Sequence, residues 1–363
     1  MKPDRAAIFA EINEILVNYD LGTLDSFEKN ERGYVNTSYG ITTRKMGKIN
    51  KYFLRRYKSG IQEVEIKFEH EVINHCLQNN FELVPRVFST RSGSTYFKKK
   101  RADQEGPPIF YSIFEFLAGE DKYTCVDPRC SKAEIKNSAA VLAQFHLAVF
   151  NLVPTGKRFE PRILDLLPRI KTIVGNSSQF SKDTGFDAYL IENSSQIIED
   201  CTLAEEYFAG LPTSTWAECV IHCDYHPGNL KFDGEKVVGL FDFDWSKIEW
   251  RSFDVALAIW YFFVSWRGKE NGILRLEESR IFLDKYQSTI QNLKSSASLT
   301  SDELHHLPMM INLGNLYVIN WAITDYYAKD FYPEENLEWL QHCLNFSRWF
   351  RETGFRELQN LFS

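Results

Sequence analysis

Four polar residues at fixed spacing stand in the segment VIHCDYHPGNLKFDGEKVVGLFDFDW, residues 220–245. His222, Asp224 and Asn229 form a His-x-Asp-x-x-x-x-Asn pattern, and Asp242 follows on a second apolar stretch. Phosphoryl transfer from ATP needs a carboxylate that orients the attacking hydroxyl and accepts its proton, and oxygen ligands that hold Mg²⁺ against the phosphates. Asp224 fits the carboxylate, and Asn229 and Asp242 fit the metal ligands. His222 would brace the loop rather than react.

The same segment has two simpler interpretations. Asp and Asn residues commonly form turns. Four neighbouring residues are also of the kinds that bind zinc: His222, Cys223, Asp224 and His226. Their spacing is not that of a recognised zinc finger, and no second ligand pair follows. By contrast, four residues match the needs of phosphoryl transfer, and they stand around two predicted strands with a Pro-Gly pair suited to a tight loop. This combination favours phosphoryl transfer over the turn and zinc interpretations.

The composition limits the class of protein. A chain of 363 residues predicts about two domains, and 44% apolar with 25% charged residues is ordinary for a globular protein. The net charge of −7 argues against a nucleic-acid partner. The longest uncharged apolar run, residues 255–266, is shorter than the roughly 20 residues of a membrane span. With no secretory signal and seven cysteines without a Cys-x-x-Cys pair, we expect a cytoplasmic protein that does not contact membranes.

The elements that must position these residues fall into two groups. Apolar residues at helical spacing predict helices over 5–18 and 62–79. Aromatic and β-branched residues predict strands over 34–43, 51–57, 94–100 and 109–117 and around Val87, with a hairpin turn at 44–50 and a charged loop at 101–108. The first group is therefore predicted to be mostly an antiparallel sheet with a helix packed on it.

Helices dominate the second group. They are predicted over residues 133–149, 162–174, 184–210, 253–266, 276–293 and 303–328, and the last is preceded by Thr300 and Glu303 in capping-box spacing. Two short strands are expected, one within the stretch from 220–224 to 230–232 and one over 237–243. The fold class that follows is α+β.

The chain resembles the aminoglycoside phosphotransferase and choline kinase superfamily. The segment 220–245 looks like the Brenner-type signature of that superfamily, and the pieces KYFLRRY, VPRVF, IFEFLAGE, AAVLAQFHLAV and RSFDVALAIWYF match in order and spacing. The stretch NYDLGTLDSFEKNERGYVNTSYGITT resembles, more narrowly, the opening of type II homoserine kinases. The resemblance implies a two-lobed protein-kinase-like fold, with an antiparallel β-rich N-lobe over 1–115, a hinge over 116–118 and a larger, mainly helical C-lobe over 119–363.

The resemblance also assigns residues to the nucleotide. The loop over 33–40 would cover the ATP phosphates, with three residues nearest them: Asn36, Thr37 and Ser38. Arg55 stands where the superfamily usually has a phosphate-pairing Lys, and it is preferred over Arg56 because it shares a strand face with Phe53. Glu69 would pair with that cation, with Glu71 as the competing carboxylate.

Other assignments concern adenine and the support of the catalytic loop. The backbone of Glu115, Phe116 and Leu117, in the hinge, would meet the adenine, and Phe241 could stack on it. Asp254 resembles the buried Asp that anchors the catalytic loop, and Asp244 would assist the metal site. His146, on an apolar helix face, is expected to be a core histidine.

Recognition of the phosphate acceptor remains open at this stage. The main candidates are Tyr225, His226, Trp245, Arg251 and Asp325, and the wider set adds Lys247, Glu249, Trp250, Asn312, Asn315, Tyr317, Trp321 and Tyr326. For homoserine, Arg251 would bind the carboxylate and Asp325 the ammonium. A choline-like acceptor would use an aromatic cage of Trp245, Trp250, Trp260 and Tyr261.

The resulting expectation is an ATP- and Mg²⁺-dependent kinase. It would phosphorylate a hydroxyl of a small metabolite such as homoserine, an amino alcohol or an amino sugar. One alternative is a catalytically weak nucleotide-binding pseudokinase or regulatory module, because Arg55 replaces the usual Lys. Another is a protein kinase acting on Ser or Thr, against which stands the absence of Asp-Phe-Gly and Ala-Pro-Glu segments.

Overall fold

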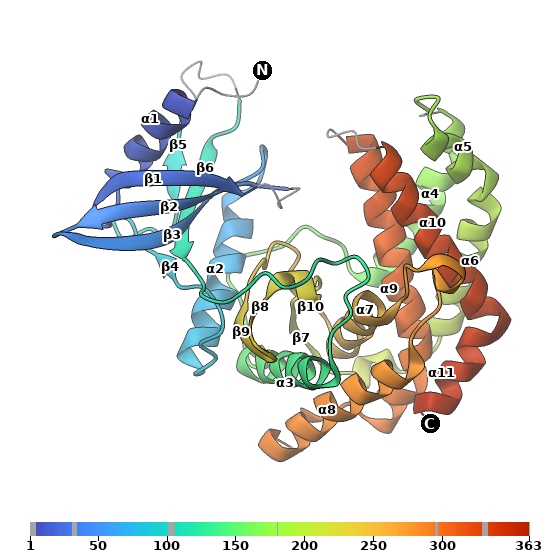
Figure 1. Cartoon of the computed structure of the whole chain (residues 1–363). Coiled ribbons are helices and arrows are strands. Elements are labelled where there is room, and N and C mark those ends of the chain that lie inside the picture. The colour runs from blue at the N-terminus through green and yellow to red at the C-terminus, as the bar shows by residue number, and fades with distance from the viewer. Residues whose placement is uncertain are drawn as a thin grey trace. The chain divides into compact units, whose positions relative to one another are not determined.

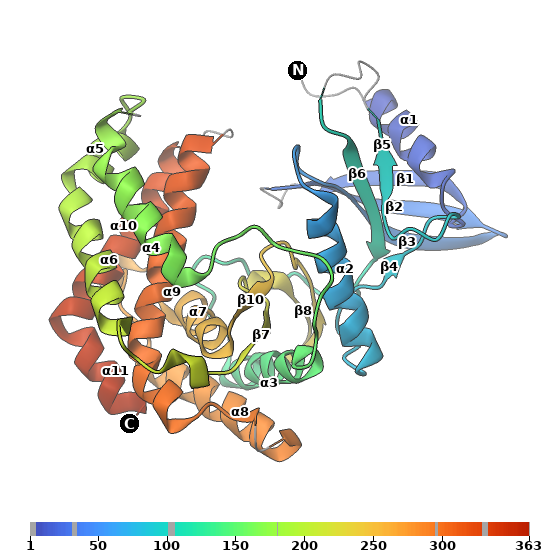
Figure 2. The same ribbon diagram turned by 180° about the vertical axis from the view of Figure 1, so that it is seen from behind.

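The structure is a computed structural model that describes residues 5–30, 35–100, 106–179, 181–294, 297–328 and 333–362. The chain forms two compact units (Figures 1 and 2). Unit 1 comprises Met1–Gly119, Leu152–Phe159 and Val238–Phe241, and unit 2 comprises Glu120–Asn151, Glu160–Val237 and Asp242–Ser363.

Unit 1 is an antiparallel sheet with two helices. Its strands are β1 (Thr23–Asn30), β2 (Thr37–Lys45), β3 (Lys48–Arg56), β4 (Val87–Phe88), β5 (Phe97–Lys99) and β6 (Ile109–Glu115). The sheet order is β1-β2-β3-β6-β4, with β5 also pairing with β6. The helices are α1 (Arg5–Leu16) and α2 (Glu63–Gln78). Both helices and the antiparallel sheet were predicted from the sequence.

The alternation of side chains along the strands assigns one face of this sheet to each helix. Tyr39, Ile41 and Leu54 are buried in one cluster with Ile12 and Ile15 of α1. The strand residues that alternate with these point to the opposite face of the sheet. On that face Arg55 of β3 pairs with Glu69 of α2 at 2.8 Å. One apolar cluster of unit 1 therefore lies under α1. The opposite face carries the Arg55–Glu69 ion pair and a second apolar cluster, in which Ile66 of α2 is buried with Phe110.

Strand β1 is the element of unit 1 that the sequence analysis missed. Its sequence TLDSFEKN is mostly polar, and only Leu24 and Phe27 are buried in the strand. It pairs with β2 alone, at the edge of the sheet, and its register shifts between Leu24 and Ser26. An edge strand with an irregular register carries too little alternation to be recognised from the sequence.

Unit 2 is mainly helical. Its helices are α3 (Lys132–Val149), α4 (Ile163–Gly175), α5 (Gly185–Glu192), α6 (Ser194–Phe208), α7 (Arg251–Phe263), α8 (Leu276–Lys294), α9 (Ser301–Ala328), α10 (Pro333–Trp349) and α11 (Phe355–Phe362). Figures 1 and 2 show α3 beside α8 and α7 beside α9, in agreement with their contacts. No helix in the described ranges is long and apolar enough to cross a membrane.

Four short strands carry the candidate catalytic segment. They are β7 (Glu218–Ile221), β8 (Leu230–Asp233), β9 (Lys236–Leu240) and β10 (Lys247–Trp250), paired as β7 with β10 and β8 with β9. The end of β9 belongs to unit 1, where the Leu240 amide donates to the Leu83 carbonyl at 2.7 Å. Strand β10 was not predicted from the sequence.

The predicted helices of unit 2 are confirmed, with three differences. The helix predicted over 184–210 is two helices, because the backbone leaves the helical conformation at Asn193. Helices α10 and α11 were not predicted. The predicted capping box before α9 is present: the Thr300 amide donates to the Glu303 carboxylate at 2.9 Å, and the Glu303 amide donates to Thr300 Oγ1 at 3.1 Å.

Candidate active site

Asp224 lies on the loop that joins β7 to β8, and a side chain of the same loop holds its carboxylate. The chain turns through a short helical segment, Pro227–Asn229, so that Asn229 Nδ2 donates to Asp224 Oδ2 at 2.8 Å and to the Asp224 carbonyl at 2.9 Å. The Asp224 side chain is 18% exposed. The predicted base and one predicted metal ligand therefore contact each other directly.

A buried carboxylate anchors the start of this loop. Asp254, in the first turn of α7, accepts the backbone amides of His222 at 2.9 Å and Cys223 at 2.8 Å. Cys223 has a φ of 62°, which is unfavourable for a residue with a Cβ. Two charge-assisted hydrogen bonds stabilise this strained backbone immediately before Asp224.

His146 completes the anchor and is a core histidine, as predicted. Its Nε2 lies 2.9 Å from Asp254 Oδ2, and its Nδ1 lies 2.7 Å from the Tyr286 hydroxyl. Burial acts to raise the pKa of Asp254, but the hydrogen bonds from His146 and from the His222 amide hold that pKa below its ordinary value. Asp254 therefore remains an acceptor of hydrogen bonds at neutral pH.

His222 is fully buried and cannot reach a substrate from this position. Its ring packs against Phe243 at 4.8 Å and Phe145 at 6.1 Å. The zinc interpretation is not supported, because no group of three or more His, Cys, Asp and Glu residues in the described ranges could hold a metal ion. Burial also raises the pKa of the Cys223 thiol to about 12, which disfavours the thiolate that zinc requires.

Asp242 follows β9 and also has a left-handed backbone, with a φ of 68°. Its side chain and that of Asp244 are half-buried. Residues other than glycine in this region of φ are uncommon and concentrate at functional sites. Cys223 precedes the β8–β9 hairpin and Asp242 follows it. At both positions the surrounding structure holds the backbone in an unfavourable conformation.

The candidate nucleotide-binding residues in unit 1 lie on the α2 face of the sheet. Ser38 on β2, Arg55 on β3 and Ser112 on β6 are direct cross-strand partners. Arg55 Nη1 contacts Glu69 Oε1 at 2.8 Å, and both side chains are buried. Glu69 rather than Glu71 therefore forms the ion pair with Arg55.

Two further residues hold this ion pair and were missed in the sequence analysis. The Tyr57 hydroxyl donates to Glu69 Oε2 at 2.8 Å and lies 3.1 Å from His70 Nε2. Burial, reinforced by Arg55 and Arg158, lowers the pKa of His70 to about 3, so this histidine is neutral. The signal for Tyr57 was present in the sequence, because it stands two residues after Arg55 in an extended segment.

The loop predicted to cover the phosphates is only partly described, since residues 33 and 34 lie outside the described ranges. Asn36 Oδ1 accepts the backbone amide of Lys58 at 2.9 Å, so this side chain fixes the loop to the end of β3. Thr37 is half-buried and Ser38 is buried. Of the three, Ser38 is placed directly opposite Arg55.

The predicted hinge follows β6. The Glu115 amide already donates to the Arg86 carbonyl at 2.8 Å, so it is not available to adenine. Phe116 is 45% exposed and Leu117 is half-buried. These two residues therefore offer the accessible backbone and side-chain atoms of this segment.

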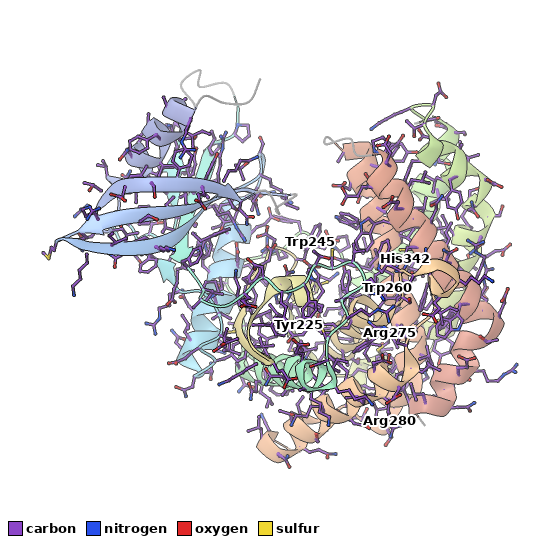
Figure 3. All side chains as sticks on the ribbon, in the orientation of Figure 1. Tyr225, Trp245, Trp260, Arg275, Arg280 and His342 are labelled. Atoms are coloured by element: carbon purple, nitrogen blue, oxygen red, sulfur yellow. The ribbon has the colours of Figure 1, made fainter. Side chains whose placement is uncertain are left out.

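Several acceptor candidates are core residues instead. Tyr225, labelled in Figure 3, is fully buried, and its hydroxyl donates to the Ser138 carbonyl of α3 at 2.7 Å. Arg251 is 1% exposed, and no contact in the described residues joins it to Asp325. Instead, Asn336 donates to the Asp325 carboxylate at 3.2 Å. The predicted homoserine pair of Arg251 and Asp325 is therefore not formed.

Other candidates anchor α4 or the helical core. Glu249 accepts the Ile163 amide at 2.8 Å, and Lys247 donates to the Pro161 carbonyl at 2.7 Å. Four late-helix candidates are buried: Asn312, Asn315, Tyr317 and Tyr326. Their burial is that of core residues, and the Tyr326 hydroxyl, for example, donates to Asp187 Oδ2 at 2.5 Å.

The four proposed cage residues do not form one cage. Trp260 and Tyr261 pack edge-to-face at 5.4 Å, and Tyr261 also packs against His226 at 5.2 Å. Trp250 packs instead against Trp216 at 5.0 Å. In the described residues no ring contact joins Trp245 or Trp250 to Trp260 and Tyr261, so the four predicted cage residues are not brought together.

Solved structures that resemble this chain include kinases of small molecules. Amicoumacin kinase hAmiN, in complex with AMP-PNP, Ca²⁺ and Ami, matches with a TM-score of 0.66 at 14% identity over 95% of this chain and 94% of that chain. The microcompartment-associated aminopropanol kinase matches with a TM-score of 0.61 at 15% identity over 97% and 99%. At these identities the likeness establishes the fold, which is α+β and kinase-like.

The sequence comparison establishes the family. The model of the phosphotransferase enzyme family matches residues 26–275, and the chain belongs to this family. A homoserine kinase of Parvibaculum lavamentivorans is 24% identical over 302 residues, which cover 83% of this chain and 80% of that protein.

Proposed function

We propose that this protein transfers the γ-phosphoryl group of ATP to a hydroxyl of a small metabolite. The observation that carries the proposal is the Asp224–Asn229 pair, with Asn229 Nδ2 at 2.8 Å from Asp224 Oδ2, on a loop whose strained backbone is anchored by Asp254. A carboxylate held in one orientation can accept a hydrogen bond from an acceptor hydroxyl and take its proton during transfer.

Asn229 and Asp242 would hold Mg²⁺. Because the Asn229 nitrogen makes the hydrogen bonds to Asp224, its amide oxygen is the atom left to bind a metal ion. Amide and carboxylate oxygens are ligands that suit Mg²⁺. When bound, the ion would neutralise charge on the ATP phosphates.

The remaining roles fall to unit 1. Arg55, whose Nη1 lies 2.8 Å from Glu69 Oε1, would bind phosphate oxygens. Ser38, its cross-strand partner, would add a hydroxyl donor. Asn36 and Thr37 would position the backbone of the same loop, and Leu117 would meet the adenine. Most of the catalytic effect would come from positioning and from neutralisation of charge.

The acceptor class that fits best is an amino compound with a free hydroxyl. A homoserine kinase relative that covers 83% of the chain supports homoserine, and a fold neighbour named as an aminopropanol kinase supports an amino alcohol. An amino sugar is a further member of the class. The second candidate function is a nucleotide-binding module without transfer activity, which the substitution of Arg for Lys at position 55 favours.

The test is release of ADP from Mg·ATP with homoserine, ethanolamine, choline, 1-amino-2-propanol, hexosamines and aminoglycosides. We expect one acceptor to stimulate turnover, and Asp224→Asn to lower kcat by about 10²–10⁴-fold while the Kd for AMP-PNP stays within about 3-fold. Asp233→Asn, at an exposed position, is the matched control. Binding of AMP-PNP without turnover by any acceptor would favour the module, and full activity of Asp224→Asn would refute the assignment of the base.

A further inference from the structure

We infer that His226 is a positioning residue that fixes the Asp224 carboxylate through its Nε2 atom, rather than a residue that contacts the acceptor. The inference deepens the proposed function and rests on it, because it assumes that Asp224 is the base. Nothing in the family membership of the chain assigns a role to His226.

The first observation is how the two carboxylate oxygens of Asp224 are held. Asn229 Nδ2 contacts Oδ2 at 2.8 Å, and His226 Nε2 lies 3.5 Å from Oδ1. The second distance is longer than a hydrogen bond. Contacts of this kind are often long in ligand-free enzymes and shorten when substrate binds. Where the Nε2 contact shortens to a hydrogen bond, a donor lies at each oxygen and rotation of the carboxylate about χ2 is restricted.

The second observation concerns the protonation of the His226 ring. His226 Nδ1 is buried and has no hydrogen-bond partner among the residues that the structure describes. A buried N–H without an acceptor is more unfavourable than a buried lone pair without a donor. The neutral ring therefore carries its hydrogen on Nε2, where it points to Asp224. The same burial prevents Nδ1 from binding an acceptor molecule.

The third observation is that the surroundings are shaped to the ring. A Cβ on Gly228 would lie 2.9 Å from His226 Cε1 and 3.0 Å from Nδ1, closer than side-chain carbons approach such atoms. On another side, the ring of Tyr261 packs edge-to-face at 5.2 Å. The His226 side chain is 11% exposed, so glycine and tyrosine together leave it little freedom.

A positioning role predicts a specific kinetic pattern. Loss of the Nε2 donor would leave nucleotide and acceptor binding intact but allow Asp224 to rotate away from the acceptor hydroxyl. Misplacement of a reacting group by about 1 Å can lower the rate by about 100-fold. The effect should therefore fall on kcat and not on KM.

The decisive experiment compares two amides of different length. In His226→Gln the amide nitrogen can occupy the place of Nε2, whereas in His226→Asn it reaches only the place of Nδ1. We expect Gln to keep kcat within about 3-fold, and Asn to lower kcat by about 10–100-fold with unchanged KM values for ATP and for homoserine or whichever panel acceptor is active. Equal losses in both variants, or a raised acceptor KM at constant kcat, would overturn the inference.

Gly228→Ala supplies an independent perturbation of the same ring. We expect it to lower kcat in the wild-type protein but to lower it less in the His226→Asn background, where the ring is absent and the contact at 3.1 Å to the Cys125 backbone nitrogen remains. Additive losses in this double-mutant cycle would show that Gly228 acts separately from His226. Thermal unfolding of each variant checks that the fold is kept.

A readout without activity separates failure of the inference from failure of the proposed function. In protein labelled with ¹⁵N-histidine, long-range ¹H–¹⁵N spectra distinguish the two tautomers, and the His226 signals are those lost in His226→Gln. We expect hydrogen on Nε2 and a shifted Nε2 signal in Asp224→Asn. Hydrogen on Nδ1 would overturn the inference whether or not the protein is a kinase. Absence of turnover with every acceptor of the panel would count against the proposed function instead, and turnover independent of Asp224 would overturn only the assignment of the base.

Discussion

At the scale of single residues, one buried carboxylate determines the geometry of the catalytic loop. Both oxygens of Asp254 accept backbone amides of the loop, and one also contacts His146. Such an arrangement stabilises a left-handed Cys223 that would otherwise be unfavourable. The loop is thus held by a residue that stands 30 positions after Asp224 in the sequence.

Replacement of Asp254 by Asn tests this anchor. The amide keeps the shape but presents an NH₂ group where the carboxylate accepted a backbone N–H. We expect a loss of about 3–5 kcal/mol in the free energy of unfolding and a lower kcat. All eight tryptophans lie in unit 2, so fluorescence during urea unfolding reports on the unit that contains Asp254. Asp233→Asn is the surface control, and equal stability of the two variants would contradict the role of Asp254 as an anchor.

A buried histidine predicts how stability depends on pH. Burial lowers the pKa of His342 to about 3, against the opposing effect of Asp127, whereas an unfolded histidine titrates near 6.5. The unfolded chain therefore binds a proton that the folded chain does not. As a result, the free energy of unfolding falls as pH decreases from about 6.5 towards 3, by up to about 1.4 kcal/mol per pH unit from this residue.

His342→Phe removes the group that binds this proton in the unfolded chain. The new ring can still stack on Trp266, whose ring centroid lies 3.7 Å from that of His342. We expect a flatter slope of stability between pH 6 and 4.5, measured by tryptophan fluorescence. An unchanged slope would show that His342 is accessible to protons in the folded protein.

At the scale of elements, a segment distant in sequence packs against α2. The Thr155 and Gly156 amides donate to the Glu71 carboxylate at 2.8 and 3.0 Å, and the Lys157 amide donates to the Val64 carbonyl at 3.0 Å. Glu71 therefore has a defined role, which is to hold residues 152–159 against the helix that carries Glu69. Neither periodicity nor composition could have predicted this contact.

Gly156 is required for this close approach. A Cβ at this position would lie 2.2 Å from the Phe68 nitrogen and 2.7 Å from the Val64 carbonyl oxygen, both of which are backbone atoms that cannot move aside. We expect Gly156→Ala to destabilise unit 1 by about 1–3 kcal/mol, seen as faster hydrogen exchange of α2 amides. Gly175→Ala, where nothing lies within 4 Å of the new Cβ, should change stability little. Equal effects of the two substitutions would refute this packing argument.

At the scale of the whole molecule, the residues proposed for one reaction are distributed over both compact units. Arg55, Glu69 and Ser38 belong to unit 1, and Asp224, Asn229 and Asp242 belong to unit 2. Mg²⁺ held by Asn229 and Asp242 would neutralise charge on the ATP phosphates. Binding of nucleotide should therefore depend on the metal.

This dependence can be measured by thermal unfolding with AMP-PNP. At a concentration of 100 times Kd, binding stabilises the folded state by about 2.7 kcal/mol. We expect both chelation of Mg²⁺ by EDTA and the substitution Asp242→Asn to weaken AMP-PNP binding. Each tenfold loss of affinity for AMP-PNP should reduce this stabilisation by about 1.4 kcal/mol. Equal stabilisation by AMP-PNP with and without Mg²⁺ would argue against Asp242 as a metal ligand.

Local patterns in the sequence determined most of the elements and the chemistry. Helical and strand periodicities predicted the α+β class, because each element must bury one face, and the His-x-Asp-x-x-x-x-Asn spacing lies within one loop. The prediction failed for the edge strand β1, whose pattern is weak. It also missed α10 and α11, although α10 carries buried residues at helical spacing, such as Trp339, Leu340 and Cys343. It also failed for acceptor residues, since an aromatic residue in a core and one in a pocket look alike in sequence.

The sequence by itself determined the types and spacing of the residues in the catalytic loop, because neighbours in the chain stay close whatever surrounds them. The family resemblance suggested Asp254 as the anchor of that loop. Only the tertiary structure decided which other distant groups support the loop and the ion pair: His146 on Asp254, Tyr57 on Glu69, and the space that Gly228 leaves for the His226 ring. The orientation of a side chain depends on packing against elements brought together by folding. For this reason the sequence suggested His226 as an acceptor contact, whereas its burial and its contact with Asp224 indicate a positioning residue.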